Sequence, residues 1–147
     1  MAHIKRHIDV VASPDAVFSL LTDLDRLPEW ATIVVDSRDA SARPLTAGCT
    51  FRQTIRVMGR ELDTEWRVTE FEPARRLAYE ATAAMGGHLA MTQTITPRDG
   101  GTRVQLEVDY ELPGGFLGDL LDAAGVEAHN EREAERSLQN LKELLDA

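Results

Sequence analysis

The chain has 147 residues, of which 43% are hydrophobic, and Asp and Glu outnumber Lys and Arg by 25 to 16. This length and apolar content predict one domain over residues 1–147, built around a single hydrophobic core. The formal net charge of −9 repels the phosphate backbone of nucleic acids. We therefore expect no nucleic-acid partner.

The cysteine count and the apolar runs indicate the compartment. Cys49 is the single cysteine, which excludes an internal disulfide and is typical of a reducing compartment. No apolar run follows the charged N-terminal segment, so no signal peptide is expected, and every apolar stretch is shorter than the roughly 20 residues of a membrane span. Lys5 and Lys142 are the only lysines, and this preference for Arg is typical of bacteria with GC-rich DNA. We predict a cytoplasmic bacterial protein without stable membrane insertion.

Capping residues and periodicity predict the first elements. Residues 4–10 alternate as in a strand, after which Ser13 is a good helix N-cap and Pro14 a good first helical residue. The helix that follows has one apolar face, formed by Val17, Leu20, Leu21 and Leu24. Pro28 ends that helix and begins a short helical turn that carries Trp30. A strand and two short helices are expected.

Turn signals separate six further runs typical of β-strands. The predicted strands cover residues 32–39, 50–58, 61–71, 76–83, 88–96 and 102–112. Their short connections contain Gly or Pro, which favours antiparallel hairpins. With the first strand, this gives seven strands, followed by a long helix at the C-terminal end.

Alternation along these strands predicts which face is buried. The last strand is the clearest, because Val104, Leu106, Val108 and Tyr110 point one way and the charged residues between them point the other way. The buried face also contains the neutral polar residues Gln53, Thr64 and Gln93. A purely structural core would hold fewer inward amides, since each needs a buried partner. The alternative is that these amides lie near an open end and contact water.

The last helix is expected to cover the buried face of the sheet. Its apolar stripe comprises Leu120, Ala124, Ala134, Leu138, Leu141 and Leu145. Continuing this stripe backwards places Glu131 and Glu127 on the same side and His129 opposite. Two carboxylates in an apolar cavity would have raised pKa values and serve as acid, base or ligand anchor. The alternative, which we favour, is that both belong to an ordinary solvated helix surface.

Three features resemble one known superfamily: the strand, short helix and Pro-x-Trp turn at residues 4–30, the hairpin at residues 100–104, and the final helix ending at residues 137–145. Together they resemble the START/Bet v 1-like (SRPBCC) superfamily, in its polyketide cyclase/dehydrase-like branch. The resemblance implies an α+β helix-grip fold, in which a seven-stranded curved antiparallel sheet wraps around a long C-terminal helix and two short helices follow strand 1. It also implies a ligand cavity between sheet and helix.

This cavity defines the candidate ligand-binding residues, which combine large aromatic, small and neutral polar side chains. They are Trp30, Phe51, Gln53, Ile55, Trp66, Tyr79, Met91, Gln93, Tyr110, Leu120 and Ala124. The alternative for the aromatic members is a plain role in the hydrophobic core.

No motif identifies a metal, a cofactor or a catalytic nucleophile. His3, His7, His88 and His129 lack the spacing of a ligand set, and Cys49 has no nearby His in the sequence. We expect no cofactor and no metal site, and the catalytic residues remain unknown.

The favoured function is binding of a small hydrophobic molecule, a lipid or a polyketide-like compound, by a monomer or homodimer. One alternative is a polyketide cyclase/aromatase or dehydratase that acts by confinement and by polar groups such as Gln53, Tyr79, Gln93, Tyr110 and Glu131. Another is a protein-interaction module of the stress or toxin–antitoxin type, using the acidic helix surface.

Overall fold

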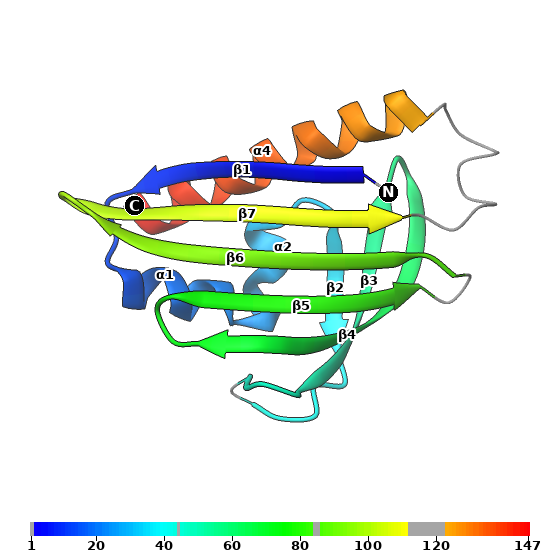
Figure 1. Ribbon diagram of the computed structural model, residues 1–147, viewed down its shortest axis with the longest axis horizontal. Coiled ribbons are helices and arrows are strands. Elements are labelled where there is room, and N and C mark those ends of the chain that lie inside the picture. The colour runs from blue at the N-terminus through cyan, green and yellow to red at the C-terminus, as the bar shows by residue number, and fades with distance from the viewer. Residues whose placement is uncertain (1, 44, 84–85, 112–122) are drawn as a thin grey trace.

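The computed structural model describes residues 2–43, 45–83, 86–111 and 123–147, apart from the side chains of residues 83, 123 and 124. Seven strands form one antiparallel sheet in the order β1-β7-β6-β5-β4-β3-β2, and Figure 1 shows that β2 and β3 cross the direction of β5, β6 and β7. The strands are β1 (Ala2–Val10), β2 (Val34–Arg38), β3 (Thr50–Val57), β4 (Arg60–Glu72), β5 (Arg76–Ala83), β6 (His88–Arg98) and β7 (Gly101–Glu111). The pairing register shifts between Val34 and Asp36 in β2 and between Val68 and Glu70 in β4, as at a β-bulge.

In the described part of the chain, three short helical segments follow β1, and one long helix follows β7. They are α1 (Pro14–Leu21), a 3₁₀ turn η1 (Leu24–Arg26), α2 (Leu27–Trp30) and α4 (Ala123–Asp146). The predicted α+β helix-grip fold is therefore confirmed. None of the helices within the described ranges is long and apolar enough to cross a membrane.

Local capping explains where α1 begins and ends. Ser13 Oγ accepts a hydrogen bond from the Ala16 N–H at 3.2 Å, and Pro14 is the first helical residue. At the other end, Thr22 Oγ1 donates to the Phe18 carbonyl at 2.9 Å. The N-terminal boundary is the predicted one. The predicted C-terminal boundary at Pro28 is wrong, because α1 ends at Leu21 with Thr22 as its cap and Leu24 belongs to the separate turn η1.

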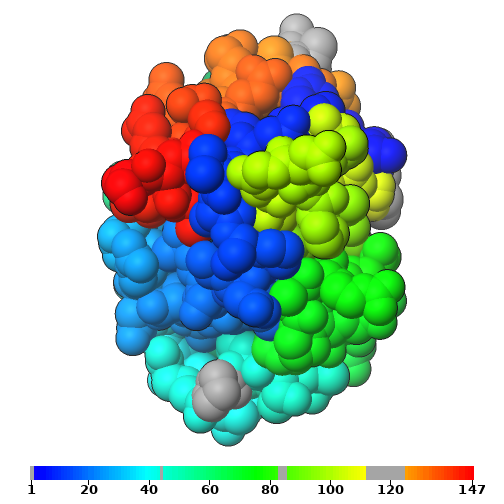
Figure 2. All heavy atoms as spheres, turned by 90° about the vertical axis from the view of Figure 1, so that its left-hand side faces the viewer, coloured from blue at the N-terminus to red at the C-terminus, as the bar shows by residue number. Residues whose placement is uncertain are grey.

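Helix α1 closes one end of the sheet. It packs against β6 and β7, and the Phe18 ring meets the Phe71 ring of β4 edge to face, with centroids 5.1 Å apart. Figure 2 views this end, with α1 in blue between the C-terminal end of α4 (red), the β6–β7 turn (yellow-green) and the green strand ends. Gly101 fits here because a Cβ at that position would collide with the Val10 carbonyl oxygen.

The predicted phase of the strands is confirmed. Along β4 and β3, residues alternate between buried and exposed, so that Trp66 is 4% exposed while its neighbour Arg67 is exposed. On the outer face, Arg67 pairs with Glu80 at 3.5 Å and Arg103 with Asp9 at 2.8 Å. One face of the sheet is thus charged and solvated, and the other is covered.

Helix α4 is the cover, and it lies along β1 and against α2 (Figure 1). Leu138 and Leu141 are its fully buried residues near the C-terminal end. Polar contacts add to this packing, because the Asn140 amide donates to the Trp30 carbonyl at 3.3 Å and the Thr32 N–H donates to Ser137 Oγ at 3.0 Å. Strand β2 consequently begins at Val34, two residues later than the predicted start at residue 32, since Thr32 bonds to the helix and not to the sheet.

Candidate functional site

A cavity of about 120 Å³ lies between the inner face of the sheet, α2 and the middle of α4. An apolar cavity of about 150 Å³ in another protein binds benzene, so the space suits a ligand of roughly one aromatic ring. Nine residues predicted from the sequence line it: Trp30, Phe51, Gln53, Ile55, Trp66, Tyr79, Met91, Gln93 and Tyr110. Predicted Leu120 lies outside the described residues, as does the side chain of Ala124. The part that any of these side chains plays in binding stays a prediction.

Other walls of the cavity come from residues that sequence reasoning did not select. The aliphatic members are Ile4, Leu27, Ala31, Ile33, Val34, Val57, Leu89, Leu106 and Val108, and the α4 members are Asn130, Glu133, Ala134 and Ser137. Strand alternation indicates several of the aliphatic ones, such as Leu106 and Val108. Of the α4 members, Ala134 belongs to the predicted apolar stripe, whereas the polar residues Asn130, Glu133 and Ser137 escape a search for such stripes.

Three aromatic rings on adjacent strands form one side of the cavity. Phe51 on β3 lies parallel to Trp66 on β4, with centroids 6.3 Å apart. Tyr79 on β5 meets both rings edge to face at 5.9 Å. The strand register brings them together, since Phe51 is directly opposite Trp66 and Tyr79 is opposite Val68. Such pairs contribute about 0.5–1.5 kcal/mol each beyond their buried area, so this wall is pre-organised.

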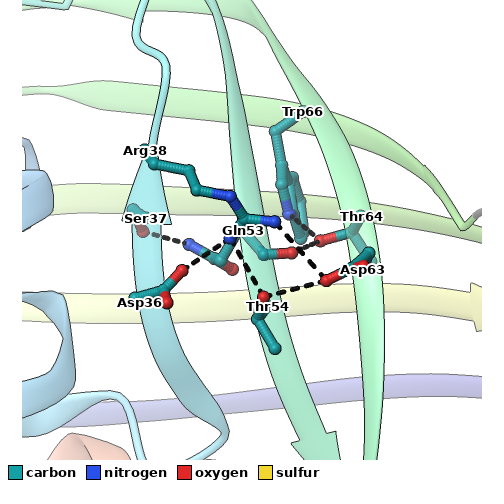
Figure 3. A network of polar contacts seen from close by, with 8 residues as sticks. All are labelled: Asp36, Ser37, Arg38, Gln53, Thr54, Asp63, Thr64 and Trp66. Atoms are coloured by element: carbon teal, nitrogen blue, oxygen red, sulfur yellow. Dashed lines mark hydrogen bonds and ion pairs between the residues drawn. The ribbon is translucent and has the colours of Figure 1, made fainter.

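A hydrogen-bond network behind this wall fixes the Trp66 indole (Figure 3). Thr64 Oγ1 accepts from Trp66 Nε1 at 2.8 Å and donates to the Gln53 carbonyl at 2.7 Å. The Gln53 side-chain amide donates to Ser37 Oγ at 2.9 Å. Gln53 and Gln93 are 5% and 3% exposed, so the alternative that these amides contact water at an open end is wrong.

Three buried polar atoms on cavity-lining residues have no hydrogen-bond partner among the residues that the structure describes. They are Trp30 Nε1, Gln93 Oε1 and the Tyr110 hydroxyl. The other end of the Gln93 amide donates only to the Met91 sulfur, at 3.7 Å, a weak acceptor. An unsatisfied buried polar group costs about 1–3 kcal/mol, so three in one cavity indicate a place for polar atoms of a ligand or of water.

Burial keeps both cavity tyrosines protonated. It raises the pKa of Tyr79 far above its ordinary value, with no compensating partner. Burial also raises the pKa of Tyr110, and the carboxylates of Glu127 and Glu131 raise it further. The Asn130 amide lies close enough to lower the Tyr110 pKa, although the two groups lack the geometry of a hydrogen bond. At neutral pH these phenols can donate a hydrogen bond but cannot serve as bases.

The acidic residues of α4 divide between solvent and cavity. Glu127 is exposed, and Glu131 pairs with Arg6 at 3.5 Å with 44% of its side chain exposed, so the solvated interpretation of these two is confirmed. Glu133 instead lines the cavity, with 19% of its side chain exposed, and its nearest cation is Arg136 at 3.9 Å. Counting back from Leu141 in steps of four residues, through Ser137, leads to Glu133.

The histidines and the cysteine lie apart from this cavity. The His3 imidazole bonds to the Asp109 carboxylate at 2.6 Å on the outer face of the sheet, and Cys49 is buried near Ser41. Within the described ranges, no three residues of the types His, Cys, Asp and Glu come together in a group that would hold a metal ion.

Comparisons with known proteins point to one family. The family model described as polyketide cyclase / dehydrase and lipid transport matches residues 1–146. An uncharacterized protein of Mycobacterium tuberculosis is 29% identical over 144 residues, which cover 98% of this chain and 99% of that protein. An aromatase/cyclase from Streptomyces sp. R1128 has a TM-score of 0.77 at 20% identity, over 98% of this chain and 93% of that one. A START superfamily protein from Mycobacterium smegmatis has a TM-score of 0.72 at 13% identity, over 97% and 96% of the two chains.

Proposed function

The chain belongs to the polyketide cyclase/dehydrase and lipid transport family, and we propose that it binds one small hydrophobic molecule in the cavity between the sheet and α4. The observation that carries the proposal is a largely apolar cavity walled by five aromatic side chains. These are Trp30, Phe51, Trp66, Tyr79 and Tyr110. The atoms that line an apolar void lack van der Waals contacts on one side, and a ligand that fills the void supplies these contacts.

Quenching of tryptophan emission by bromobenzene tests this proposal. Both tryptophans of the chain, Trp30 and Trp66, line the cavity, so a heavy-atom quencher that enters it meets both indoles. We expect saturable quenching, together with a rise in melting temperature as the ligand concentration exceeds the Kd.

A matched pair of variants makes the test specific to the cavity. Ala134→Phe places a ring in the cavity and should abolish saturable quenching, whereas Ala128→Phe, on the exposed side of the same helix, should leave it unchanged. Circular dichroism and unfolding curves establish that both variants fold. A folded Ala134→Phe protein that still binds bromobenzene as tightly as the parent would contradict the proposal.

The Tyr110 hydroxyl supports a second candidate, a polyketide cyclase or dehydratase. Such an enzyme needs a group that donates a proton to a carbonyl or leaving hydroxyl oxygen, and Tyr110 is protonated, buried in the cavity wall and unpartnered within the described chain. Tyr110→Phe should then lower the kcat for a β-keto thioester by a larger factor than it weakens binding. Equal turnover by the variant and the parent would remove this candidate and leave the binding function untouched.

A further inference from the structure

We infer that the cavity selects uncharged molecules that carry a hydroxyl or carbonyl group and rejects carboxylates. This inference rests on the proposed binding function and specifies its ligand class. It depends on two observations: the charges around the cavity, and the unpaired polar atoms in its wall.

The lining supplies no cation. Among the cavity-lining residues that the structure describes, Glu133 alone is charged. The remaining stretches, residues 1, 44, 84–85 and 112–122, contain no Lys, Arg or His side chain. A carboxylate ligand would therefore meet a negative side chain and no cation, with only the neutral donors of Trp30 and Tyr110 to bond to.

The basic residue on the inner side of β1, Arg6, already forms ion pairs with α4. Arg6 follows the cavity-lining Ile4 by two positions, but its guanidinium pairs with Glu131 at 3.5 Å and with Glu135 at 3.0 Å. Recruiting Arg6 to a ligand would break both pairs. The cation on this side is used to hold α4 against the sheet.

Desolvation sets the size of the selectivity. Burial of a carboxylate beside another negative charge and without a counter-ion favours its protonated form. A carboxylic acid with a pKa of about 4 would have to bind as its neutral form, which at pH 7 is about one part in a thousand. Its apparent affinity at neutral pH should thus be about 10³-fold below that of an uncharged analogue of equal size.

The unpaired polar atoms define what the cavity accepts. Trp30 Nε1 is a donor, Gln93 Oε1 is an acceptor, and the Tyr110 hydroxyl is both. A phenol or alcohol can donate to an amide oxygen and accept from an indole N–H, and a ketone can accept from the indole or the phenol. Each hydrogen bond gained by a group that is otherwise buried unpaired should raise affinity about 5- to 100-fold.

The two indole N–H signals in a proton–nitrogen correlation NMR spectrum provide the test. Trp66 Nε1–H already donates to Thr64 and serves as the internal reference, while Trp30 Nε1–H can donate to a ligand. The protein is titrated at pH 7 with ethylbenzene, 4-ethylphenol and 4-ethylbenzoate, and Trp30→Phe assigns the signals. We expect ethylbenzene to bind, 4-ethylphenol to bind more tightly and move the Trp30 signal downfield, and 4-ethylbenzoate to bind only as the pH falls towards its pKa.

The outcomes separate the two claims. Failure of ethylbenzene and of 4-ethylphenol together would overturn the proposed binding function. Binding of ethylbenzene with equal or tighter binding of 4-ethylbenzoate at pH 7 would overturn the selectivity alone.

Two matched variants test the role of Glu133. Glu133→Gln should strengthen 4-ethylbenzoate binding, and the exposed Glu143→Gln should leave it unchanged. Gln93→Leu should reduce the preference for 4-ethylphenol over ethylbenzene, and an unchanged preference would overturn the assigned role of this amide.

Discussion

The two ends of the inner sheet face are built differently. At the end closed by α1, Val17 and Leu21 are at most 1% exposed, and Phe18 packs on Phe71. Under the middle of α4, the helix presents the small side chains Ala134 and Ser137 and leaves a cavity. The same sheet thus carries a close-packed core at one end and a hollow at the other, which separates the part that stabilises the fold from the part that is free to hold a ligand.

The largest expected difference between the two ends is in the free energy of unfolding. Leu21→Ala removes a fully buried side chain from the packed end and should cost about 2–5 kcal/mol, because a new void opens there. Met91→Ala only enlarges an existing cavity around a half-buried side chain and should cost less than about 1.5 kcal/mol. Urea denaturation of both variants measures the difference. Equal losses would show that the two ends are packed alike.

A smaller effect is expected in the polar network behind the cavity. Thr64→Val keeps the side-chain shape but leaves the buried Trp66 Nε1–H without its acceptor, which should cost about 1–3 kcal/mol. Thr54→Val is the control, since Thr54 contacts Arg38 and Asp63 on the solvated face, and a change within about 0.5 kcal/mol is expected. If both substitutions had the same small effect in chemical denaturation, the network would not hold the aromatic wall.

The smallest effect concerns alkaline pH. Both tyrosines of the chain, Tyr79 and Tyr110, line the hollow end, and burial raises their pKa values above the ordinary 10.0. Their contribution to stability is therefore complete below pH 10 and is lost above it, because the unfolded chain ionises before the folded one. For Tyr79 the loss should be about 1.4 kcal/mol at pH 11. Phenolate absorbance should rise together with unfolding. Reversible ionisation of a tyrosine near pH 10 in the folded protein would contradict this placement.

The sheet and its cavity wall could be predicted from the sequence because strand alternation has a period of two. Phe51, Trp66 and Leu89 each point inward from β3, β4 and β6. Because the side alternates from residue to residue, these three positions determine which other residues point inward, including Gln53 and Gln93. The superfamily resemblance, which the family match and the solved structures confirm, supplied the helix cover that alternation alone does not give.

The helix side of the cavity could not be predicted in the same way. A stripe chosen by hydrophobicity leads from Leu138 to Glu131, whereas the face over the cavity carries Asn130, Glu133 and Ser137. Where a helix lies over a cavity, it buries little apolar surface. The inward face then carries few hydrophobic residues, and a hydrophobic stripe no longer identifies it. Polar contacts mark it instead, as in the bond from the Thr32 N–H to Ser137.

The pairing of β1 with β7 has a consequence for the order of folding. Ile4 and Val108 are direct partners in the sheet and both line the cavity, and α4 then packs along β1. During synthesis the first strand leaves the ribosome about a hundred residues before its partner, so it has no place in the sheet until nearly the whole chain has emerged. Closing so long a loop is slow, and such contacts form late. We therefore expect the cavity to be completed at the end of folding, when the last helix packs along β1.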